Sequence, residues 1–398
     1  MSVASYDVVV VGGGINGVGV AQAAAAAGYS VMLLEKQAVA AGTSSKSSKL
    51  IHGGLRYLES YEFGLVRESL RERALLLKLA PDLVQKQTFI LPVYKDMRRS
   101  PWLLRTGLSL YYLLSGLDAD ARFSKVPRAA WGSLEGLRTD GLEAVFRYMD
   151  ARTDDALLTE AVMRSAQSLG AQLSCPGHFS GAEIHNAGCR VHYRVGQAER
   201  ECDAQVIVNA AGPWVNAVVD GIKPSPPRMA IELVQGAHIV LPVAGSEFEG
   251  QNFYYVESPR DGRAVFVMPR GPQLLIGTTE TRGRKDPEQV APLPAEETYL
   301  LGILHHYFPA LRHLGRNDLL GSWAGLRVLP GGEGHAFHRS RETVLHCDRK
   351  RGPRVLTIYG GKLTSYRVTA GKVMDKIRGS LPNREAVADT RELTLSLD

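Results

Sequence analysis

A short apolar strand, a glycine-rich turn and an alanine-rich helix open the chain, and this order constrains the fold more than any other feature. Residues 6–11 are a β-branched run, residues 12–17 read GGGING, and a helix is expected over 15–27. A second apolar strand is expected over 29–34, with Glu35 at its end. In such a βαβ unit the glycines let a pyrophosphate approach the helix N-terminus, and the acidic residue accepts a hydrogen bond from the adenosine ribose. The pattern predicts a dinucleotide site and leaves NAD and FAD both open.

The composition is that of a folded globular chain. Its 398 residues suggest two domains, or one large α/β unit with an insertion. A hydrophobic content of 44% argues against disorder as the default. The net charge of +6 favours anionic partners such as phosphorylated metabolites, nucleic acid or acidic lipid, without selecting among them.

The cysteines and the apolar segments bear on location. Four cysteines without a CxxC pair indicate a reducing compartment, so we expect a cytoplasmic protein with no metal site. We expect no signal peptide and no spanning helix, so that any membrane contact would be peripheral. Residues 98–117 combine Arg98, Arg99 and Arg105 with Trp102 and a leucine-rich run. This mixture suits either a membrane interface or a helix packed on the protein or at a dimer contact.

Strand and helix patterns alternate through the rest of the chain around one long β-rich region. Alternation over 228–281 predicts a separate antiparallel sheet. Residues 186–188 are the expected turn of a hairpin. Further helices are expected over 59–79, 154–169, 296–308 and 365–377, and further strands near 172 and over 206–209, 322–329 and 355–358.

A polar segment, GTSSKSSKLIHGGLRY at 42–57, narrows the cofactor. Its hydroxyls and small residues can bond a flavin pyrophosphate and allow close backbone approach, although a polar surface loop has the same composition. Together with GGGINGVG at 12–19 and GGKLTSYR at 360–367, this segment resembles the FAD-dependent glycerol-3-phosphate dehydrogenase family, within the D-amino-acid-oxidase-like group. The likeness runs from about residue 6 to residue 367 and favours FAD over NAD.

The glycine turn and the resemblance together predict the residues that bind FAD. They lie in the turn, in the polar segment, after the strand at 206–209 and in the Gly-Gly-Lys segment. The predicted contacts are Gly12, Gly14, Ile15, Asn16, Gly17, Glu35, Thr43, Ser44, Ser48, Lys49, Leu50, His52, Gly53, Ala211, Gly212, Gly361, Lys362, Leu363 and Thr364.

The resemblance also implies substrate contacts and catalytic groups. Arg56 and Tyr57 would bind the phosphate of a glycerol-phosphate ester, for which a guanidinium is a suitable donor. His238 is the candidate base, because histidine has its unperturbed pKa nearest neutrality. Arg327 matches an arginine near the substrate hydroxyls, where it would polarise the developing ketone.

Two further cations belong to this implied site. Lys362 has two roles open to it, at the flavin N1–C2=O edge or on the substrate phosphate, and Arg341 matches a second arginine less securely. From the residues alone, Arg56 also fits a surface ion pair, His238 a structural strand histidine and Lys362 a solvated lysine.

We therefore expect a fold of mixed α/β and α+β class. A doubly wound FAD-binding domain would be assembled from residues 1–84, 150–222 and 345–398. An antiparallel-sheet substrate domain would comprise residues 85–149 and 223–344. Members of the resembled family usually continue into a helical C-terminal domain, and the chain is expected to be a short form without it.

The expected reaction is oxidation of sn-glycerol 3-phosphate to dihydroxyacetone phosphate by C2 hydride transfer to flavin N5. The family's bacterial members are peripheral membrane enzymes that pass electrons to quinone, so quinone or another acceptor is expected, with contact at the cytoplasmic face of the membrane. Two alternatives remain: FAD-dependent oxidation of another small alcohol or amine, such as a 2-hydroxy acid, and a flavin-binding interaction protein without catalysis. We expect no nucleic-acid partner, and a homodimer is left open.

Overall fold

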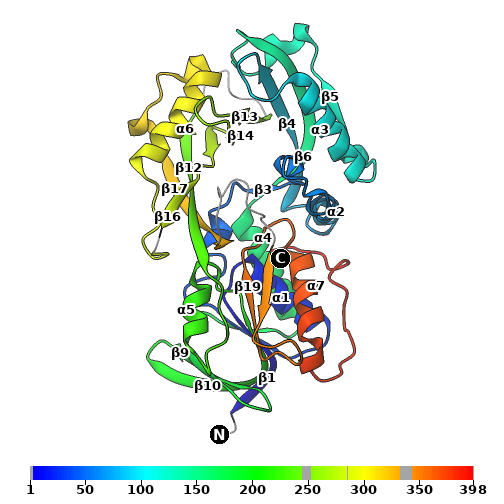
Figure 1. The fold of residues 1–398 in the computed structure, drawn as a ribbon, viewed down its shortest axis with the longest axis vertical. Coiled ribbons are helices and arrows are strands. Elements are labelled where there is room, and N and C mark those ends of the chain that lie inside the picture. The colour runs from blue at the N-terminus through cyan, green and yellow to red at the C-terminus, as the bar shows by residue number, and fades with distance from the viewer. Residues whose placement is uncertain (1–2, 244–251, 285, 332–342, 398) are drawn as a thin grey trace.

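A computed structural model describes residues 3–243, 252–284, 286–331 and 343–397. Within these residues the strands form two sheets, one in the lower half of Figure 1 beside the N-terminus and one in the upper half. The helices are α1 (Ile15–Ala26), α2 (Phe63–Leu79), α3 (Pro101–Leu114), α4 (Asp155–Ser168), α5 (Val215–Asp220), α6 (Pro294–Tyr307) and α7 (Tyr366–Ile377).

The first sheet has a parallel centre and an antiparallel edge. Its strands are β1 (Ala4–Val11), β2 (Val31–Leu34), β7 (Gln172–Ser174), β8 (His178–Ile184), β9 (Cys189–Val195), β10 (Ala198–Asn209), β11 (Ile222–Lys223), β18 (Val344–Cys347) and β19 (Val355–Tyr359). Parallel pairing joins β10, β1, β2 and β7, while β8 and β9 form an antiparallel hairpin. The valines of β1 are buried, as a strand covered on both faces requires.

Helix α1 lies unusually close to its neighbours because of two glycines. A Cβ on Gly17 would stand 1.9 Å from the carbonyl oxygen of Gly12, and one on Gly19 would stand 2.6 Å from the ring of Tyr366 in α7. Small side chains along α1 also let it pack on α4. This packing fixes the N-terminus of α1 at the carboxyl end of β1, where ligands bind in open α/β sheets.

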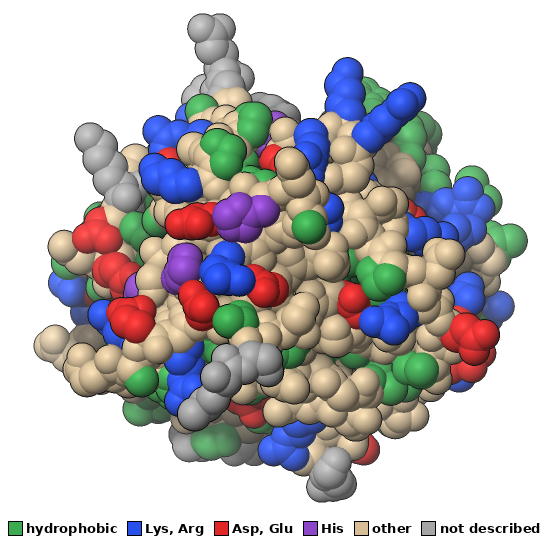
Figure 2. Space-filling view, turned by 90° about the horizontal axis from the view of Figure 1, so that it is seen from below, with side chains coloured by type: hydrophobic (Ala, Val, Ile, Leu, Met, Phe, Trp, Pro, Cys, Tyr) green, Lys and Arg blue, Asp and Glu red, His purple; other side chains and the backbone are tan. Residues whose placement is uncertain are grey.

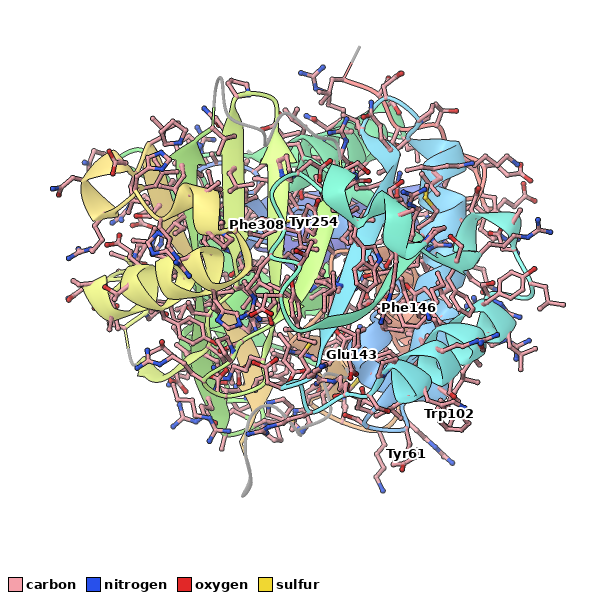
Figure 3. All side chains as sticks on the ribbon, turned by 90° about the horizontal axis from the view of Figure 1, so that it is seen from above. Tyr61, Trp102, Glu143, Phe146, Tyr254 and Phe308 are labelled. Carbon is pink, nitrogen blue, oxygen red and sulfur yellow. The ribbon has the colours of Figure 1, made fainter. Side chains whose placement is uncertain are left out.

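The second sheet is mostly antiparallel. Its strands are β3 (Leu50–Ile51), β4 (Val84–Tyr94), β5 (Phe123–Lys125), β6 (Leu142–Thr153), β12 (Ile231–Pro242), β13 (Phe253–Glu257), β14 (Ala264–Arg270), β15 (Gln273–Gly277), β16 (Thr281–Arg284) and β17 (Gly321–Pro330). Strands β12 and β17 pair from Ile231 opposite Pro330 to Val240 opposite Gly321. In its core the Tyr254 ring packs edge-on against Phe308, with centroids 5.1 Å apart (Figure 3).

The predicted fold class is confirmed, because the chain combines a doubly wound sheet with a separate antiparallel one. Some elements differ in extent from their sequence patterns. The helix expected over 59–79 begins at Phe63, and a 3-10 turn, η2 (Leu55–Leu58), precedes it. Strand β3 pairs with β6 of the second sheet, although its residues fall in the range 1–84 expected for the FAD-binding domain.

The face of the molecule shown in Figure 2 has no single large patch of one charge among its described side chains. Lysines and arginines are scattered there among acidic side chains and histidines. The β9–β10 hairpin lies at this end of the molecule (Figure 1), and its Arg190 bonds Asp203 at 2.9 Å. Among the described residues, no helix combines the length and the apolar character that crossing a membrane requires.

Candidate active site

A cavity of about 900 Å³ is lined by residues of both sheets. This volume lies at the upper end of the range for ligand sites, as a cavity for a large cofactor and a small substrate requires. Much of the lining comes from parts of the ranges 11–16, 34–37, 41–57, 210–214, 236–238, 324–330 and 360–364, and further residues come from strands of the second sheet.

The glycine turn forms one end of the cavity. Gly12 has φ +110°, and a Cβ there would stand 2.6 Å from the carbonyl oxygen of Ala210. Gly14 is the N-cap of α1 and has no side chain to bond the first amides of the helix. Gly14, Ile15 and Asn16 all line the cavity, so the positive end of the α1 dipole faces it. This end of the cavity suits a pyrophosphate.

Glu35 and Asn16 hold the turn in place. One carboxylate oxygen of Glu35 accepts a hydrogen bond from Gly13 N at 2.7 Å and the other accepts one from Gln37 N at 2.8 Å. Asn16 Nδ2 donates to Gly360 O at 3.2 Å. Its Oδ1 is buried and has no hydrogen-bond partner among the described residues, so it can accept a hydrogen bond from a ligand.

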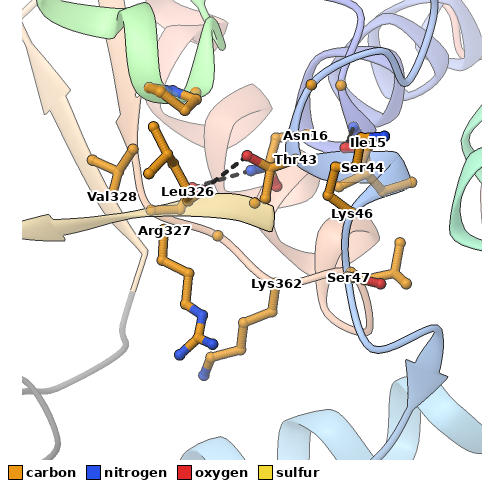
Figure 4. Close-up of a pocket in the computed structure, with 18 of the residues that line it drawn as sticks. Ile15, Asn16, Thr43, Ser44, Lys46, Ser47, Leu326, Arg327, Val328 and Lys362 are labelled. Carbon is orange, nitrogen blue, oxygen red and sulfur yellow. Dashed lines mark hydrogen bonds between the residues drawn. The ribbon is translucent and has the colours of Figure 1, made fainter. Parts of the chain in front are cut away.

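The polar segment crosses the cavity and is bonded to elements of both sheets. Ile15 N donates to Ser44 Oγ, and Thr43 Oγ1 donates to Leu326 O of β17 (Figure 4). Ser47 N donates to Asp155 at the start of α4, and His52 N donates to the Thr364 hydroxyl. The segment therefore joins α1, β17, α4 and the Gly-Gly-Lys segment around one cavity.

Most of the predicted cofactor residues line the cavity. Besides those already described, they are Ser48, Leu50, His52, Ala211, Gly212, Gly361, Lys362, Leu363 and Thr364. Three others do not. Gly17 packs on Gly12, Gly53 packs on Tyr111, and the ammonium of Lys49 pairs with buried Asp155. No local sequence pattern marks Asp155, which holds the polar segment on α4 through Lys49 and Ser47.

His238 is buried at the wall of the cavity. It stacks on Trp323, with ring centroids 5.5 Å apart, and its Nε2 lies 2.9 Å from Ser48 Oγ. Burial, and then the charges of Arg327 and other cations, lower the pKa of His238 to about 3. The imidazole is therefore neutral near pH 7, the state in which a histidine can accept a proton.

Two glycines make room for the His238 and Arg327 side chains. Both side chains extend from the same face of paired strands, since His238 lies opposite Trp323 and Arg327 is four residues along β17. A Cβ on Gly236 would stand 2.5 Å from Arg327 Nη2, and one on Gly277 would stand 2.1 Å from His238 Cδ2. These glycines serve the site, and the sequence motifs did not identify Gly277.

Two cations converge in the cavity. Figure 4 shows the side chains of Arg327 and Lys362 approaching one another from β17 and from the segment after β19. Lys362 Nζ lies 4.5 Å from the ring centroid of Tyr57, and Arg327 Nη2 donates to Thr278 Oγ1 at 3.2 Å. Arg56, which precedes Tyr57 in η2, also lines the cavity. The structure thus brings Arg56, Tyr57, Arg327 and Lys362 together.

Sequence reasoning missed several aromatic lining residues. Phe89, Tyr148, Tyr255 and Phe266 line the cavity, and all four come from strands of the second sheet. An alternating apolar strand carries no local mark that shows which of its aromatic side chains faces a ligand. The predicted Arg341 lies outside the described residues.

The donors and spaces of this cavity fit FAD. The glycine turn at the α1 N-terminus, with Ser44 beside it, can take the pyrophosphate, and Asn16 Oδ1 and the segment 43–52 supply further polar atoms. Glu35 lines the cavity at the end of β2, where an adenosine ribose binds in this class of fold.

Comparisons with known proteins agree with this fit. The family model for FAD-dependent oxidoreductases, DAO, matches residues 7–367. The chain is 38% identical to the D-erythritol 1-phosphate dehydrogenase of Brucella abortus over 94% of this chain and 74% of that protein. It is also 38% identical to the glycerol-3-phosphate dehydrogenase of Pseudomonas aeruginosa over 95% and 72%.

A solved structure shows the same architecture with the cofactor. It is the glycerol-3-phosphate dehydrogenase of Bacillus halodurans complexed with FAD, 28% identical, with a TM-score of 0.76 over 98% of this chain and 68% of that one. The match of the family model over residues 7–367 and the 38% identity to relatives of which the chain covers 72–74% establish the family and the cofactor. The chain belongs to the DAO family of FAD-dependent oxidoreductases, in the group with FAD-dependent glycerol-3-phosphate dehydrogenases.

Proposed function

We propose that this protein oxidises the secondary alcohol of sn-glycerol 3-phosphate to dihydroxyacetone phosphate. The observation that carries the proposal is the convergence of Arg327 and Lys362 in a cavity that also contains the FAD-binding turn and His238. An anionic group is the expected occupant of a space between two cations. In this proposal the domain of the first sheet binds FAD, and the domain of the second sheet covers the substrate.

The phosphate would be held by groups from two parts of the chain. Lys362 and Tyr57 are in contact, and Arg56 lies beside Tyr57 in the same wall. A guanidinium and an ammonium together can neutralise a phosphate dianion and bond its oxygens from different directions. The predicted Arg341, outside the described residues, would be a further donor.

The proton and the hydride would leave the alcohol on different routes. When bound, FAD supplies the hydride acceptor at N5. His238 would take the hydroxyl proton at Nε2, the atom that now faces Ser48, while Arg327 stabilises the developing ketone oxygen. Burial lowers the pKa of His238 most and the charge of Arg327 lowers it further, so negative charge that develops on the substrate oxygen beside Arg327 would make the imidazole a stronger base.

A second substrate is favoured by one relative. The Brucella protein at 38% identity is a D-erythritol 1-phosphate dehydrogenase, so a four-carbon polyol phosphate is the alternative to the three-carbon one. Both share the phosphate and the secondary alcohol on which the proposal depends.

An anaerobic titration of the FAD-loaded protein tests the reaction. Glycerol 3-phosphate should abolish the visible absorbance of the oxidised flavin, and the ratio of its rate to that of erythritol phosphate ranks the two substrates. Reduction by a 2-hydroxy acid but by neither phosphate ester would replace the proposal with the carboxylate alternative. A flavin that stays oxidised with every compound would favour a binding protein without catalysis.

We also propose that α3 contacts the membrane surface and that a quinone accepts the electrons there. Trp102 is 75% exposed and Tyr61 is 80% exposed, and both point outward at one edge of the molecule (Figure 3). Leu103 and Leu113 add exposed apolar area on α3, with Arg98 and Arg105 exposed nearby. Exposed aromatic and apolar groups beside arginines suit an anionic lipid interface.

Sedimentation with anionic vesicles tests this contact. The wild-type protein should bind, and Trp102→Ser with Tyr61→Ser should release it. Leu320→Ser is the matched control, since Leu320 is 56% exposed and lies immediately before β17, outside α3. Equal binding of all variants would exclude α3 as the contact, and concentration-dependent dimers lost on Trp102→Ser would make the face a dimer contact.

A further inference from the structure

A buried carboxylate, Asp150, lies in the lining of the cavity that contains Arg327 and Lys362. Asp150, in β6, is 4% exposed. A carboxylate near a site for an anion would weaken its binding unless the charge is offset. Arg73, in α2, offsets it: Nη1 donates to Asp150 Oδ1 at 2.8 Å and to Met149 O at 2.9 Å. The proposed reaction gives this carboxylate no role.

Tyr111 connects the carboxylate to the backbone of the site. Its hydroxyl lies 2.9 Å from both carboxylate oxygens of Asp150 and accepts a hydrogen bond from Gly53 N at 2.8 Å. Burial raises the pKa of Tyr111 well above 10, so the phenol stays protonated and donates to Asp150. Because the hydroxyl proton of Tyr111 is donated to Asp150, a lone pair of the hydroxyl oxygen is left to accept the hydrogen bond from Gly53 N.

The Gly53 amide begins the segment that carries two proposed substrate contacts. A Cβ on Gly53 would stand 2.5 Å from the Tyr111 hydroxyl, and Gly54 has φ +75° beneath the ring of Tyr57. That ring is in turn 4.5 Å from Lys362 Nζ. A continuous series of contacts thus runs from Tyr111 through Gly53 and Tyr57 to a cation of the cavity.

Packing supports the same segment from outside. Leu55, Tyr57 and Leu58 pack against a small apolar cluster that contains Leu70 and Tyr111. This cluster restricts the side chains of η2. It does not fix the position of the η2 backbone relative to α3, because apolar contacts have little directional preference. The Gly53–Tyr111 hydrogen bond supplies the direction.

We propose that Tyr111, oriented by Asp150, is a positioning residue that fixes the backbone of residues 53–57 so that Arg56 and Tyr57 hold the anionic group of the substrate. Arg73 keeps Asp150 neutralised within this arrangement. The inference rests on the proposed function for the identity of the anion, and on the hydrogen bonds alone for the fixed backbone.

Tyr111→Phe tests the inference in the FAD-loaded protein. The variant keeps the ring and leaves Gly53 N with only a 3.4 Å contact to Asp150 Oδ1. We expect KM for glycerol 3-phosphate to rise roughly tenfold with kcat changed less than threefold, because a lost positioning bond weakens substrate binding. Tyr112→Phe is the matched control, because Tyr112 is next to Tyr111 in α3 and, in the part of the chain that the structure describes, Gly53 N bonds Tyr111 and not Tyr112.

Amide hydrogen exchange separates this inference from the proposed function. In Tyr111→Phe the peptide that covers 53–57 should exchange at least tenfold faster, with exchange over 12–17 unchanged. Unchanged exchange over 53–57, or faster exchange with KM unaltered, would overturn the positioning role. If glycerol 3-phosphate fails to reduce the wild-type flavin, the proposed function fails while exchange still reports on Tyr111.

Asp150→Asn is a second variant, which keeps the Tyr111 hydroxyl but removes the counter-charge of buried Arg73. It keeps the volume of the side chain but frees the Tyr111 hydroxyl from a fixed orientation. We expect the same changes in exchange and KM, smaller than in Tyr111→Phe. Normal KM and normal exchange in this variant would show that Asp150 does not orient Tyr111.

Discussion

Ser48 Oγ lies 2.9 Å from His238 Nε2, and this hydrogen bond joins the polar cofactor segment to the second sheet. The opposite ring nitrogen, Nδ1, is buried and has no hydrogen-bond partner among the described residues. Ser48 is therefore the group that sets the orientation of the imidazole toward the cavity. The catalytic candidate is held by a residue that the sequence assigned to the cofactor.

Replacement of His238 by Asn should slow substrate-dependent flavin reduction by a factor of about 10² to 10⁴, the usual contribution of a general base. Ser48→Ala should slow it about tenfold or less, because one hydrogen bond contributes roughly 1 kcal/mol. Stopped-flow reduction measures both rates, and His313→Asn is an exposed control. A normal rate of flavin reduction in His238→Asn would show that another group acts as the base, and Arg327 would remain as the group that contacts the alcohol.

The acid stability of the fold should depend on His238. Its folded-state pKa of about 3 lies below the ordinary 6.5, so the unfolded chain binds the proton more readily. The corresponding stability is fully present above pH 6.5 and is lost as the pH falls toward 3, by an amount on the order of a few kcal/mol. Urea unfolding at pH 7 and pH 5 should show a smaller loss for His238→Gln than for the wild type. An identical loss in both proteins would contradict the buried neutral state.

Lys362→Met should raise KM for the phosphorylated substrate by about 10- to 100-fold, since a charged hydrogen bond contributes roughly 1.5–3 kcal/mol. Lys372→Met is the control, because Lys372 is exposed on α7 and pairs with Glu68. Steady-state kinetics at constant ionic strength give both values. If KM is unchanged and only the flavin potential shifts, Lys362 belongs to the flavin edge and not to the phosphate.

Gly277→Ala should impair turnover while the protein retains FAD. The new Cβ would stand 2.1 Å from His238 Cδ2, so the ring must move away from Ser48. A displacement of about 1 Å at a catalytic group reduces rate about 100-fold. Gly302→Ala, in α6 where a Cβ meets open space, is the control and should be neutral or slightly stabilising. Normal turnover in Gly277→Ala would show that the His238 orientation is not limiting.

Glu288→Ala should release FAD a few-fold faster. Glu288 bonds Lys36 at 2.5 Å and Trp214 Nε1 at 2.7 Å, and all three residues line the cavity. Exposed ion pairs contribute at most about 1 kcal/mol, so the effect should be small and should decrease in high salt. Flavin fluorescence after dilution measures the release, with Glu392→Ala as an exposed control. If the wild type and both variants release FAD at the same rate, the contacts of Glu288 do not contribute to FAD retention.

The cofactor end of the site could be predicted because its chemistry is local in sequence. Residues 12–17 and Glu35 lie within one βαβ unit, whose turn and strand end are set by glycine conformation and apolar runs. Gly19 shows the limit of such reasoning. Its need for glycine comes from the ring of Tyr366, which is far away along the chain.

At the substrate end of the site, the residues could be predicted from the sequence but their arrangement could not. The resemblance identified His238, Arg327 and Lys362, yet the clearance provided by Gly277 depends on strand register, and no local pattern specifies it. Likewise, Asp155 acts through long-range contacts with Ser47 and Lys49, and Tyr111 through one with Gly53. Such contacts are set by the packing of whole elements.

The bonds that close the cavity also join residues made at very different times. Asn16 meets Gly360 across 344 positions, and His52 meets Thr364 across 312. During translation the glycine turn leaves the ribosome early, while β19 and α7 follow only near residue 377. Contacts of such separation form late and leave apolar surface waiting for its partner. Until β19 and α7 are made, the apolar surfaces of β10 and α1 that they cover therefore remain exposed in the nascent chain.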